Sequence, residues 1–315
     1  MSAAVGEHGS SLPARVMKRE IRDGKAWYPL PLTQEVFAAF YRVFLHRPLL
    51  PPEAPRFVFL IPLVGRKQAG DWDVVVDRLR DTLASIDAQS CADRRVVICG
   101  QDKPAGFPRD QRDMFLQASA FSPVGRSKTD RARKSRQIAR ALHALVPGFS
   151  YVVIMDADDI LHPDLCAYIA RDNNGRGYLI DRGWMVGPKG GVAPLTPEPG
   201  HYAFWEYCGT CAIVAVDTER QWLHARYLSR FVAHHHVFGR MAEAHGYPLD
   251  PVPFPAALYL FNHGSNTSVL HGRAAGKQEY MRHHVLPPEE RRMILAEFSY
   301  NPTKTASAVE GLTSA

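Results

Sequence analysis

The chain has 315 residues, of which 46% are hydrophobic and 22% are charged, a balance typical of a folded domain with a sizeable core. This composition excludes a chain that is disordered over most of its length. The 38 lysine and arginine residues outnumber the 32 acidic residues and give a formal net charge of +6, which favours anionic partners such as nucleotides, nucleic acids or anionic membranes without selecting one of them.

Two features predict the compartment. The apolar runs, such as 57–64 and 256–261, are far shorter than the roughly 20 residues that a membrane-spanning helix needs, so we expect no integral membrane span. The first residues, MSAAVGEHGSS, lack the apolar core of a signal peptide, and the cysteines are odd in number. We therefore expect a cytoplasmic protein with reduced thiols at Cys91, Cys99, Cys166, Cys208 and Cys211.

Residues 1–54 are predicted to form an N-terminal extension that precedes the main domain. The segment 36–45 could form a short apolar helix, and the prolines that follow it end that helix. No residue pattern in this segment indicates chemistry.

The main domain is predicted to begin with a buried strand from Arg56, RFVFLIPLVG, which Pro62 and Gly65 bring to an end. Asp71 is the expected N-cap of a helix with one apolar face, and a second strand follows at 94–100. A strand, a helix and a strand in this order predict a parallel pair.

A strongly basic helix is predicted at 126–140, which contains seven basic residues and one acid, Asp130. The apolar positions Ile138, Ala139 and Leu142 continue one face, so we expect the basic side chains on the exposed side. Such a run can be an ordinary solvated face. A nucleic-acid surface is the competing interpretation, although interleaved aromatic residues are missing.

The segment 151–164, YVVIMDADDILHPD, combines a buried strand with a cluster of acids directly after it. Asp156, Asp158 and Asp159 lie within four positions at the carboxyl end of that strand, where open α/β sheets bind their ligands. Neighbouring carboxylates repel one another, and oxygen ligands of this kind suit Mg²⁺ or Mn²⁺. The alternative is an acidic turn that caps a helix beginning near His162, with Asp159 or an acid beside Pro163 as the N-cap.

The apolar strand that runs into Asp-Ala-Asp-Asp, followed by His-Pro-Asp-Leu, resembles the Asp-x-Asp motif of glycosyltransferases with the nucleotide-sugar-binding A-type fold, especially family 2. The resemblance implies an α/β fold of three layers, with helices on both sides of a mixed, mostly parallel sheet. It implies a catalytic domain at 55–283, and the polar residues 284–315 that follow predict a helical tail with no motif. It also implies a hexosyltransferase that moves a sugar from a nucleotide-diphosphate sugar to a hydroxyl of a glycan or small-molecule acceptor, with no nucleic-acid partner.

On the donor side, the resemblance implies that Mn²⁺ or Mg²⁺ is held by Asp156, Asp158 and His263, which lies in the turn after the strand 256–261. It places Lys134 near the diphosphate of the donor. The family's paired acids after the second strand are missing at 100–103, so the base of the nucleotide cannot be inferred. The nucleotide-sugar-binding residues implied are Pro62, Val64, Asp102, Asp130, Lys134, Asp156 and Ala157.

On the acceptor side, a strand-like segment at 177–186 and a loop rich in glycine and proline lead to Trp205 and Glu206. The resemblance implies that this region faces the acceptor, where the ring would stack on a sugar and the carboxylate would accept from hydroxyls. Aromatic core packing with a surface glutamate is an equally open interpretation.

The catalytic base is where the chain departs from the family. The family's helix opens with Glu-Asp, whereas this chain has His234 and His235, although Arg240 further on matches. We expect His235 to act as the base, because an imidazole with a pKa near neutrality could replace the carboxylate. Glu206 is the competing base, and a retaining route needs neither.

Two further alternatives stay open. Cys208 and Cys211 match C-x-x-C, a weak zinc signal, since positions three apart on a strand point to opposite faces. A nucleotidyltransferase would also use paired acids on a metal, but the loop at Gly65 is a poor glycine-rich loop. A degenerate module that only binds nucleotide sugar or glycan is the non-enzymatic alternative.

Overall fold

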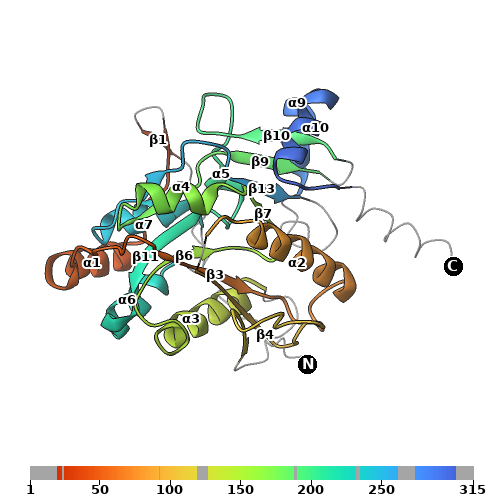
Figure 1. Ribbon diagram of the computed structural model, residues 1–315. Helices are drawn as coiled ribbons and strands as arrows, with labels where there is room; N and C mark the ends of the chain where they lie inside the picture. Colours follow the sequence, from red (N-terminus) through yellow and green to blue (C-terminus); the bar gives the residue numbers. More distant parts are fainter. Residues whose placement is uncertain are drawn as a thin grey trace, which may run out of the picture.

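Figure 1 shows the computed structural model, which describes residues 20–22, 25–91, 93–118, 127–187, 190–231, 235–261 and 274–302. The acid cluster at 156–159 lies at the junction of two sheets, and these two sheets set its position in the molecule.

The central sheet has seven strands in the order β12-β8-β11-β6-β3-β4-β5. Strand β11 is antiparallel to both of its neighbours, whereas the other neighbouring pairs are parallel. The strands are β3 (Arg56–Pro62), β4 (Arg94–Gly100), β5 (Asp113–Gln117), β6 (Phe149–Ile154), β8 (Gly177–Leu179), β11 (Ala212–Asp217) and β12 (Asp250–Pro251). The prediction of an α/β fold with a mixed, mostly parallel sheet is confirmed.

Helices cover both faces of this sheet (Figure 1). Helix α3 (Ser127–Leu145) and helix α6 (Gln221–Leu228) lie on one face, and α2 (Trp72–Asp87) and α4 (Leu165–Asp172) lie on the other. The predicted N-cap is confirmed, because Asp71 accepts hydrogen bonds from the backbone N–H groups of Asp73 and Val74. The inward face of α2 is apolar except for Thr82 and Ser85, and these two residues, together with Gln89 just after the helix, hydrogen bond the chain around and after the acid cluster.

A second sheet of four strands has the order β10-β9-β13-β7. Its strands are β7 (Ile160–Leu161), β9 (Gly183–Val186), β10 (Val192–Leu195) and β13 (Ala257–Leu260). The prediction of one strand at 177–186 is wrong, because the chain leaves the central sheet after β8 and enters the second sheet at β9. Gly183 permits this change, since a Cβ there would lie 2.6 Å from the carbonyl oxygen of Ala257.

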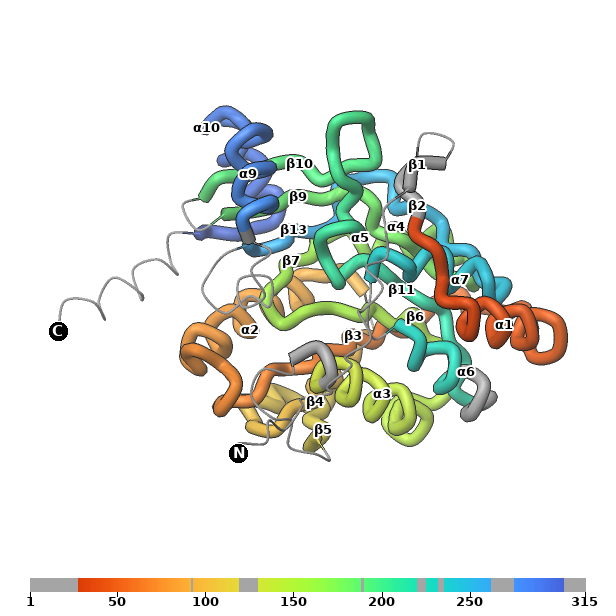
Figure 2. The backbone as a smooth tube through the Cα atoms, turned by 180° about the vertical axis from the view of Figure 1, so that it is seen from behind, coloured from red at the N-terminus to blue at the C-terminus, as the bar shows by residue number. Residues whose placement is uncertain are grey.

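The remaining elements lie around the two sheets. These elements are β1 (Glu20–Arg22), β2 (Lys25–Trp27), α1 (Leu32–Phe40), the π-helix η1 (Tyr41–Leu45), α5 (Phe204–Tyr207), the 3₁₀ turns η2 (Thr218–Arg220) and η3 (His235–Val237), α7 (Phe238–Ala244), α9 (Ala274–His284) and α10 (Pro288–Glu297). Helices α9 and α10 lie beside the second sheet, whereas α1 lies at the opposite edge of the molecule, and the view from behind shows the same arrangement (Figure 2). In the described part of the chain, no helix is long and apolar enough to cross a membrane.

Candidate active site

The acid loop, residues 156–159, connects β6 of the central sheet to β7 of the second sheet. Asp159 is buried, and Asp156 and Asp158 are partly exposed. None of the three caps α4, whose N-cap is Asp164 with no hydrogen bond from its side chain. The N-cap position thus falls on the acid beside Pro163 that the capping alternative named, although its side chain makes no capping hydrogen bond, whereas Asp159 is not the N-cap. The loops that follow β3 and β4 reach the same edge, because the carboxyl ends of parallel strands meet there.

Of the two carboxylate oxygens of Asp159, only Oδ2 is hydrogen bonded to described residues. Its Oδ2 accepts a hydrogen bond from the Thr210 hydroxyl and another from Cys208 Sγ at 3.0 Å. Its Oδ1 is buried, and the described residues offer it no hydrogen-bond partner. Burial, and after it the charges of Asp158 and Asp156, raise the pKa of Asp159 well above its usual value. Such an arrangement disfavours three negative charges unless a cation compensates them.

The C-x-x-C segment supports the acid loop. Both cysteines are free and buried, and Cys208 uses its thiol for Asp159. The Thr210 hydroxyl between them also accepts from the backbone N–H of Asp156, at 2.9 Å. These contacts give the segment a structural role in holding the acid loop.

Arg131 on α3 forms an ion pair with the acid loop, and the sequence interpretation missed it. Its Nη2 lies 2.8 Å from Asp156 Oδ1. A Cβ at position 209 would lie 2.6 Å from that Nη2 and 2.9 Å from Asp156 Oδ2, so Gly209 leaves the room that the ion pair occupies. Burial raises the pKa of Asp156, and the Arg131 guanidinium opposes that rise.

The side chain of Lys134 does not lie on the exposed basic face that we predicted, because only 2% of the residue is accessible. Its Nζ donates to Asp130 one turn earlier and to the carbonyl oxygen of Leu63, at 2.5 Å for the latter. Asp130 in turn accepts from Gln101 Nε2 at 2.8 Å. The buried pair thus ties α3 to the loops after β3 and β4.

The other predicted donor residues lie at this same edge. Asp102 accepts from the backbone N–H of Arg66 at 2.8 Å and so joins the loops after β4 and β3. The carbonyl oxygen of Ala157 accepts from the Thr82 hydroxyl at 3.0 Å. Pro62 and Val64 are partly exposed there. The structure brings these residues together, while their contact with a nucleotide stays a prediction.

Glu206 lies in α5, and both of its carboxylate oxygens are engaged. Oε2 accepts from the backbone N–H of Ala203 at 3.0 Å, and Oε1 accepts from the Tyr28 hydroxyl at 3.1 Å. The Tyr28 ring also lies edge-on to the Trp205 ring, with the centroids 5.9 Å apart. The segment in which the sequence indicated no chemistry therefore contacts the two residues that we predict to face the acceptor. A lone tyrosine between prolines and a short strand gives no sequence signal for this.

His235 lies against the same helix, with its Nδ1 2.6 Å from the carbonyl oxygen of Trp205. A carbonyl only accepts, so Nδ1 carries the proton and Nε2 has the lone pair. Burial lowers the pKa of His235 to about 3, with His236, Arg131 and Lys277 contributing in the same direction. The expectation of a pKa near neutrality is thus wrong, because the partly buried imidazole is desolvated and the nearby cations Arg131 and Lys277 disfavour its protonation.

Lys277 of α9 is a second cation that sequence reasoning missed. Its Nζ donates to the Tyr259 hydroxyl at 2.8 Å and to the carbonyl oxygen of Tyr207 at 3.2 Å. Its charge lowers the pKa of both Asp156 and His235, so it lies within electrostatic reach of both groups. A single lysine in a polar helix carries no motif that would have revealed this position.

Two predicted residues, His263 and His234, lie outside the described residues. Among the residues that the structure does describe, no group of three histidine, cysteine or acidic side chains is arranged to hold a metal ion. The metal site that we expect at Asp156, Asp158 and His263 therefore stays a prediction.

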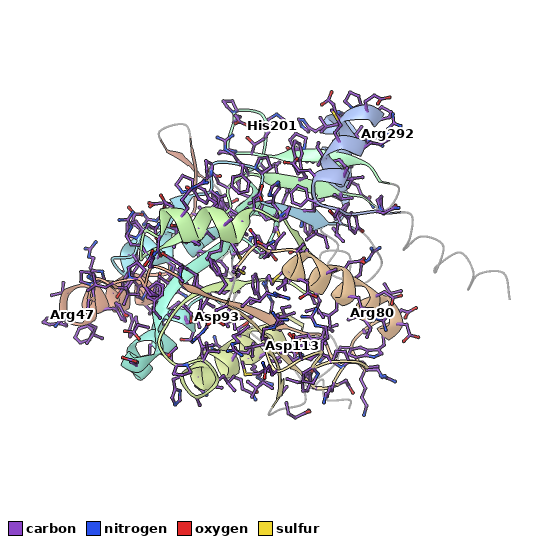
Figure 3. All side chains as sticks on the ribbon, viewed as in Figure 1. Arg47, Arg80, Asp93, Asp113, His201 and Arg292 are labelled. Atoms are coloured by element: carbon purple, nitrogen blue, oxygen red, sulfur yellow. The ribbon has the colours of Figure 1, made fainter. Side chains whose placement is uncertain are left out.

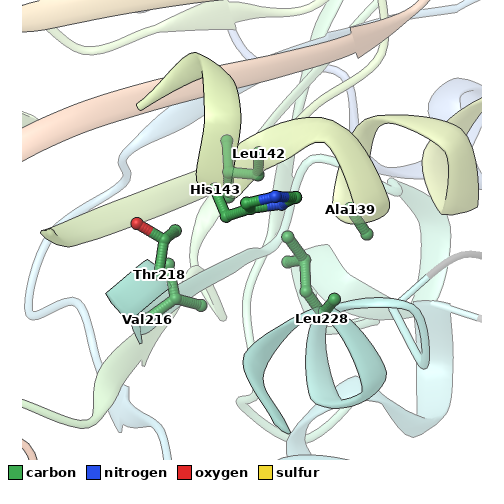
Figure 4. A pocket seen from close by; sticks show the side chains of 7 residues that line it. Ala139, Leu142, His143, Val216, Thr218 and Leu228 are labelled. Atoms are coloured by element: carbon green, nitrogen blue, oxygen red, sulfur yellow. The ribbon is translucent and has the colours of Figure 1, made fainter. Parts of the chain in front are cut away.

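Two hollows in the described part of the molecule lie away from the acid loop. One, of about 10 Å³, lies between α3 and α6 near His143 and Leu228 (Figure 4). It has room for about one water molecule. The other, of about 420 Å³, is an open groove between α2 and the loop 104–109. Neither contains the groups described above, so the candidate site is identified by its polar side chains.

The sequence matches no protein-family model and no curated protein. Among solved structures, it is similar to residues 1–349 of TarS from S. aureus, with 10% identity, a TM-score of 0.38, and coverage of 77% of this chain and 70% of that chain. It is also similar to 4-diphosphocytidyl-2C-methyl-D-erythritol synthase, with 15% identity, a TM-score of 0.36, and coverage of 70% of this chain and 97% of that chain. Both likenesses concern the course of the backbone, so the chemistry of the site must be argued from this chain's own side chains.

Proposed function

We propose that the chain is a metal-dependent glycosyltransferase that moves a sugar from a nucleotide-diphosphate sugar to an acceptor hydroxyl. The observation that carries the proposal is the acid loop at the carboxyl edge of the central sheet. There the buried Asp159 Oδ1 has no partner among the described residues, Arg131 forms an ion pair with Asp156, and the charge of Lys277 lowers the pKa of Asp156.

The acid loop suits a hard divalent cation. Its ligands are carboxylate oxygens, and burial together with mutual repulsion raises the pKa of Asp156 and Asp159, a situation that a cation relieves. Asp156 and Asp158, with His263 from the resemblance, would hold Mn²⁺ or Mg²⁺. The ion, when bound, supplies charge neutralisation of the diphosphate as it leaves.

Arg131 and Lys277 supply positive charge on the protein itself. The Arg131 guanidinium, now 2.8 Å from Asp156, can exchange that carboxylate for phosphate oxygens, which it binds in the same planar geometry. In this proposal, Asp130 and Lys134 act by holding the loops after β3 and β4 in place, since Lys134 donates to the carbonyl oxygen of Leu63 and Asp130 accepts from Gln101. In this proposal, the loop residues Pro62, Val64 and Asp102 border the nucleotide.

On the acceptor side, Trp205 would stack on a sugar ring, and Glu206 would accept from a hydroxyl with a remaining lone pair. His235 is the proton acceptor in this proposal, because its Nε2 is held in the neutral form by the bond that Nδ1 makes to Trp205. A pKa near 3 makes it a weak base, so its contribution depends on how closely it approaches the acceptor hydroxyl.

The test is incubation of the purified chain with a panel of nucleotide-diphosphate sugars and Mn²⁺ or Mg²⁺, followed by measurement of released nucleoside diphosphate. The Asp158→Asn protein is the matched control. Metal-dependent release that the control lacks supports the proposal. Pyrophosphate formed from a nucleoside triphosphate and a sugar phosphate would instead identify a nucleotidyltransferase, and tight donor binding without turnover would identify a binding module.

A further inference from the structure

The helix formed by α1 and η1 is apolar on two sides. Its inner side packs on the core through Ala38 and Tyr41, which are fully buried. Its outer side presents a row of large apolar residues that are between 51% and 74% exposed. Their spacing of three, four and eight positions places them along one face of a helix. They are Leu32, Val36, Phe40, Val43 and Phe44, hereafter the outer stripe.

The outer stripe is a patch and not a scatter of single residues. Together with Leu50, which is 89% exposed, it contains six of the eight large apolar side chains that are exposed in the described part of the chain. The rings of Phe40 and Phe44 lie 4.9 Å apart, so they form a continuous apolar surface. Contiguous patches of this kind mark surfaces that contact another molecule or a membrane.

Positive charge borders the outer stripe. Arg42 and Arg47 are exposed beside it, and the Arg226 and Arg230 guanidinium groups lie 5.8 Å and 3.9 Å from the ring of Phe37 on the same helix. None of these four arginines forms an ion pair among the described residues. Figure 3 labels Arg47 at this edge of the molecule.

Acidic residues near the helix are largely compensated. Glu35 of α1 and Glu243 of α7 share the guanidinium of Arg240, each at 3.9 Å. The positive groups Arg226 and Arg230 repel one another, since burial and then Arg226 lower the pKa of Arg230. The edge that includes α1 and the end of α6 is therefore net positive.

We propose that the outer stripe docks the protein on an anionic lipid surface. An amphipathic helix with phenylalanine and leucine on one side and arginines at its flanks binds in the headgroup region, with its apolar side chains inserted. A second copy of this chain is a poorer occupant, because a two-fold contact through the stripe would bring the same arginines of both copies together.

The docking surface is close in sequence to the acceptor side of the site. Tyr28, which donates to Glu206, lies four residues before the start of α1 at Leu32. Docking would thus anchor the segment that contributes to the acceptor side. The proposal stands on the surface of α1 alone and does not depend on the transfer reaction.

Co-sedimentation with vesicles tests it. The full chain should bind vesicles that contain phosphatidylglycerol and should bind pure phosphatidylcholine more weakly. Binding should also weaken as salt rises from about 0.1 M to about 0.5 M, because screening shortens the reach of the arginines. The triple variant Val36→Ser, Phe40→Ser, Val43→Ser should lose affinity by about tenfold or more, since three inserted apolar side chains are removed.

Matched controls separate insertion from general effects. Val285→Ser with Met293→Ser removes exposed apolar residues near α9 and α10 and should leave vesicle binding unchanged. Arg42→Gln with Arg47→Gln should weaken binding several-fold, whereas Arg282→Gln with Arg292→Gln, at the far end of the molecule, should have little effect. All of these positions are exposed, so thermal melting should be unaltered.

Three results would overturn the proposal. The first is no binding of the full chain to anionic vesicles. The second is equal binding of the triple variant and the unaltered chain. The third is a dimer, seen by sedimentation equilibrium, that the triple variant converts to a monomer without any vesicle binding, which would assign the stripe to a second copy of the chain.

Discussion

The proposed donor side and the proposed acceptor side of the candidate site are built by opposite means. The donor side takes its acids from four consecutive positions after one buried strand, and its charges are only partly compensated, with Asp159 Oδ1 left without a described partner. The acceptor side assembles Tyr28, Glu206 and His235 from three distant segments, and the polar groups there are neutral or already hydrogen bonded. Substitutions that change charge should therefore have the larger effect on the donor side, and substitutions that change the positions of side chains should have the larger effect on the acceptor side.

The largest effect should come from the donor side. Asp158→Asn should reduce the affinity for a nucleoside diphosphate in Mn²⁺ to the value measured in a chelator, and turnover should fall to background, because one oxygen ligand and one charge are lost. Calorimetric titration with and without Mn²⁺ measures this. Asp164→Asn, at an exposed N-cap with no hydrogen bond from its side chain, is the control. Affinity that is the same after chelation would contradict the charge-based account.

On the acceptor side, His235→Ala should lower turnover by about 10²- to 10⁴-fold and leave donor binding nearly intact. Because burial lowers the pKa of His235 to about 3, the imidazole is neutral above that pH, and its protonation should slow the reaction only as pH falls toward 3. The pH dependence of turnover checks this. An acidic limb near pH 6.5 that His235→Ala removes would refute the burial argument. Damage from Glu206→Gln alone would assign the base to Glu206.

The buried pair predicts a loss of stability and not of donor contact. Lys134→Met leaves Asp130 buried without its partner, which should cost about 3 to 5 kcal/mol in the free energy of unfolding. Denaturant titration measures this quantity. Adding Asp130→Asn should restore part of the loss. A stable Lys134→Met protein with weakened diphosphate affinity would return Lys134 to the role first expected from the sequence.

Arg131 should affect binding without comparable loss of stability, since it is partly exposed. Arg131→Gln should weaken nucleoside diphosphate binding by about 1 to 3 kcal/mol, the range for a charge-assisted hydrogen bond. Arg133→Gln, an exposed change two positions along the same helix, is the control in the same calorimetric titration. Equal losses from both variants would indicate a diffuse positive field.

The smallest effect should come from Tyr28→Phe, which removes one hydrogen bond to Glu206 and keeps the ring beside Trp205. We expect the KM for the acceptor to rise by a factor that corresponds to about 0.5 to 1.5 kcal/mol, with the KM for the donor unchanged. Steady-state kinetics with each substrate varied in turn measures both constants. A change in the KM for the donor alone would contradict the division of the site into a donor side and an acceptor side.

Sequence reasoning succeeded where one segment contains the whole signal. The strands β3, β4 and β6, the Asp71 cap and the placement of the acids at the end of β6 follow from local apolar runs and single turn residues. It failed where distant segments meet. No sequence pattern marks the contact of Arg131 with Asp156 or the effect of Lys277 on His235. On the basic helix, Lys134 was predicted as the phosphate-binding residue instead of Arg131, because the charge of a side chain does not reveal whether it is buried. The break between β8 and β9 was missed because both strands are apolar.

The contact between Tyr28 and Glu206 has a practical consequence for truncation. A recombinant fragment limited to the expected domain, residues 55–283, would lack the hydroxyl that holds Glu206 and the fully buried Tyr41. It would also lack Leu295 and Phe298, which pack on the second sheet from the C-terminal side. An inactive fragment of this length would therefore say nothing about the catalytic ability of the full chain, and the shortest informative fragment has to begin before Tyr28.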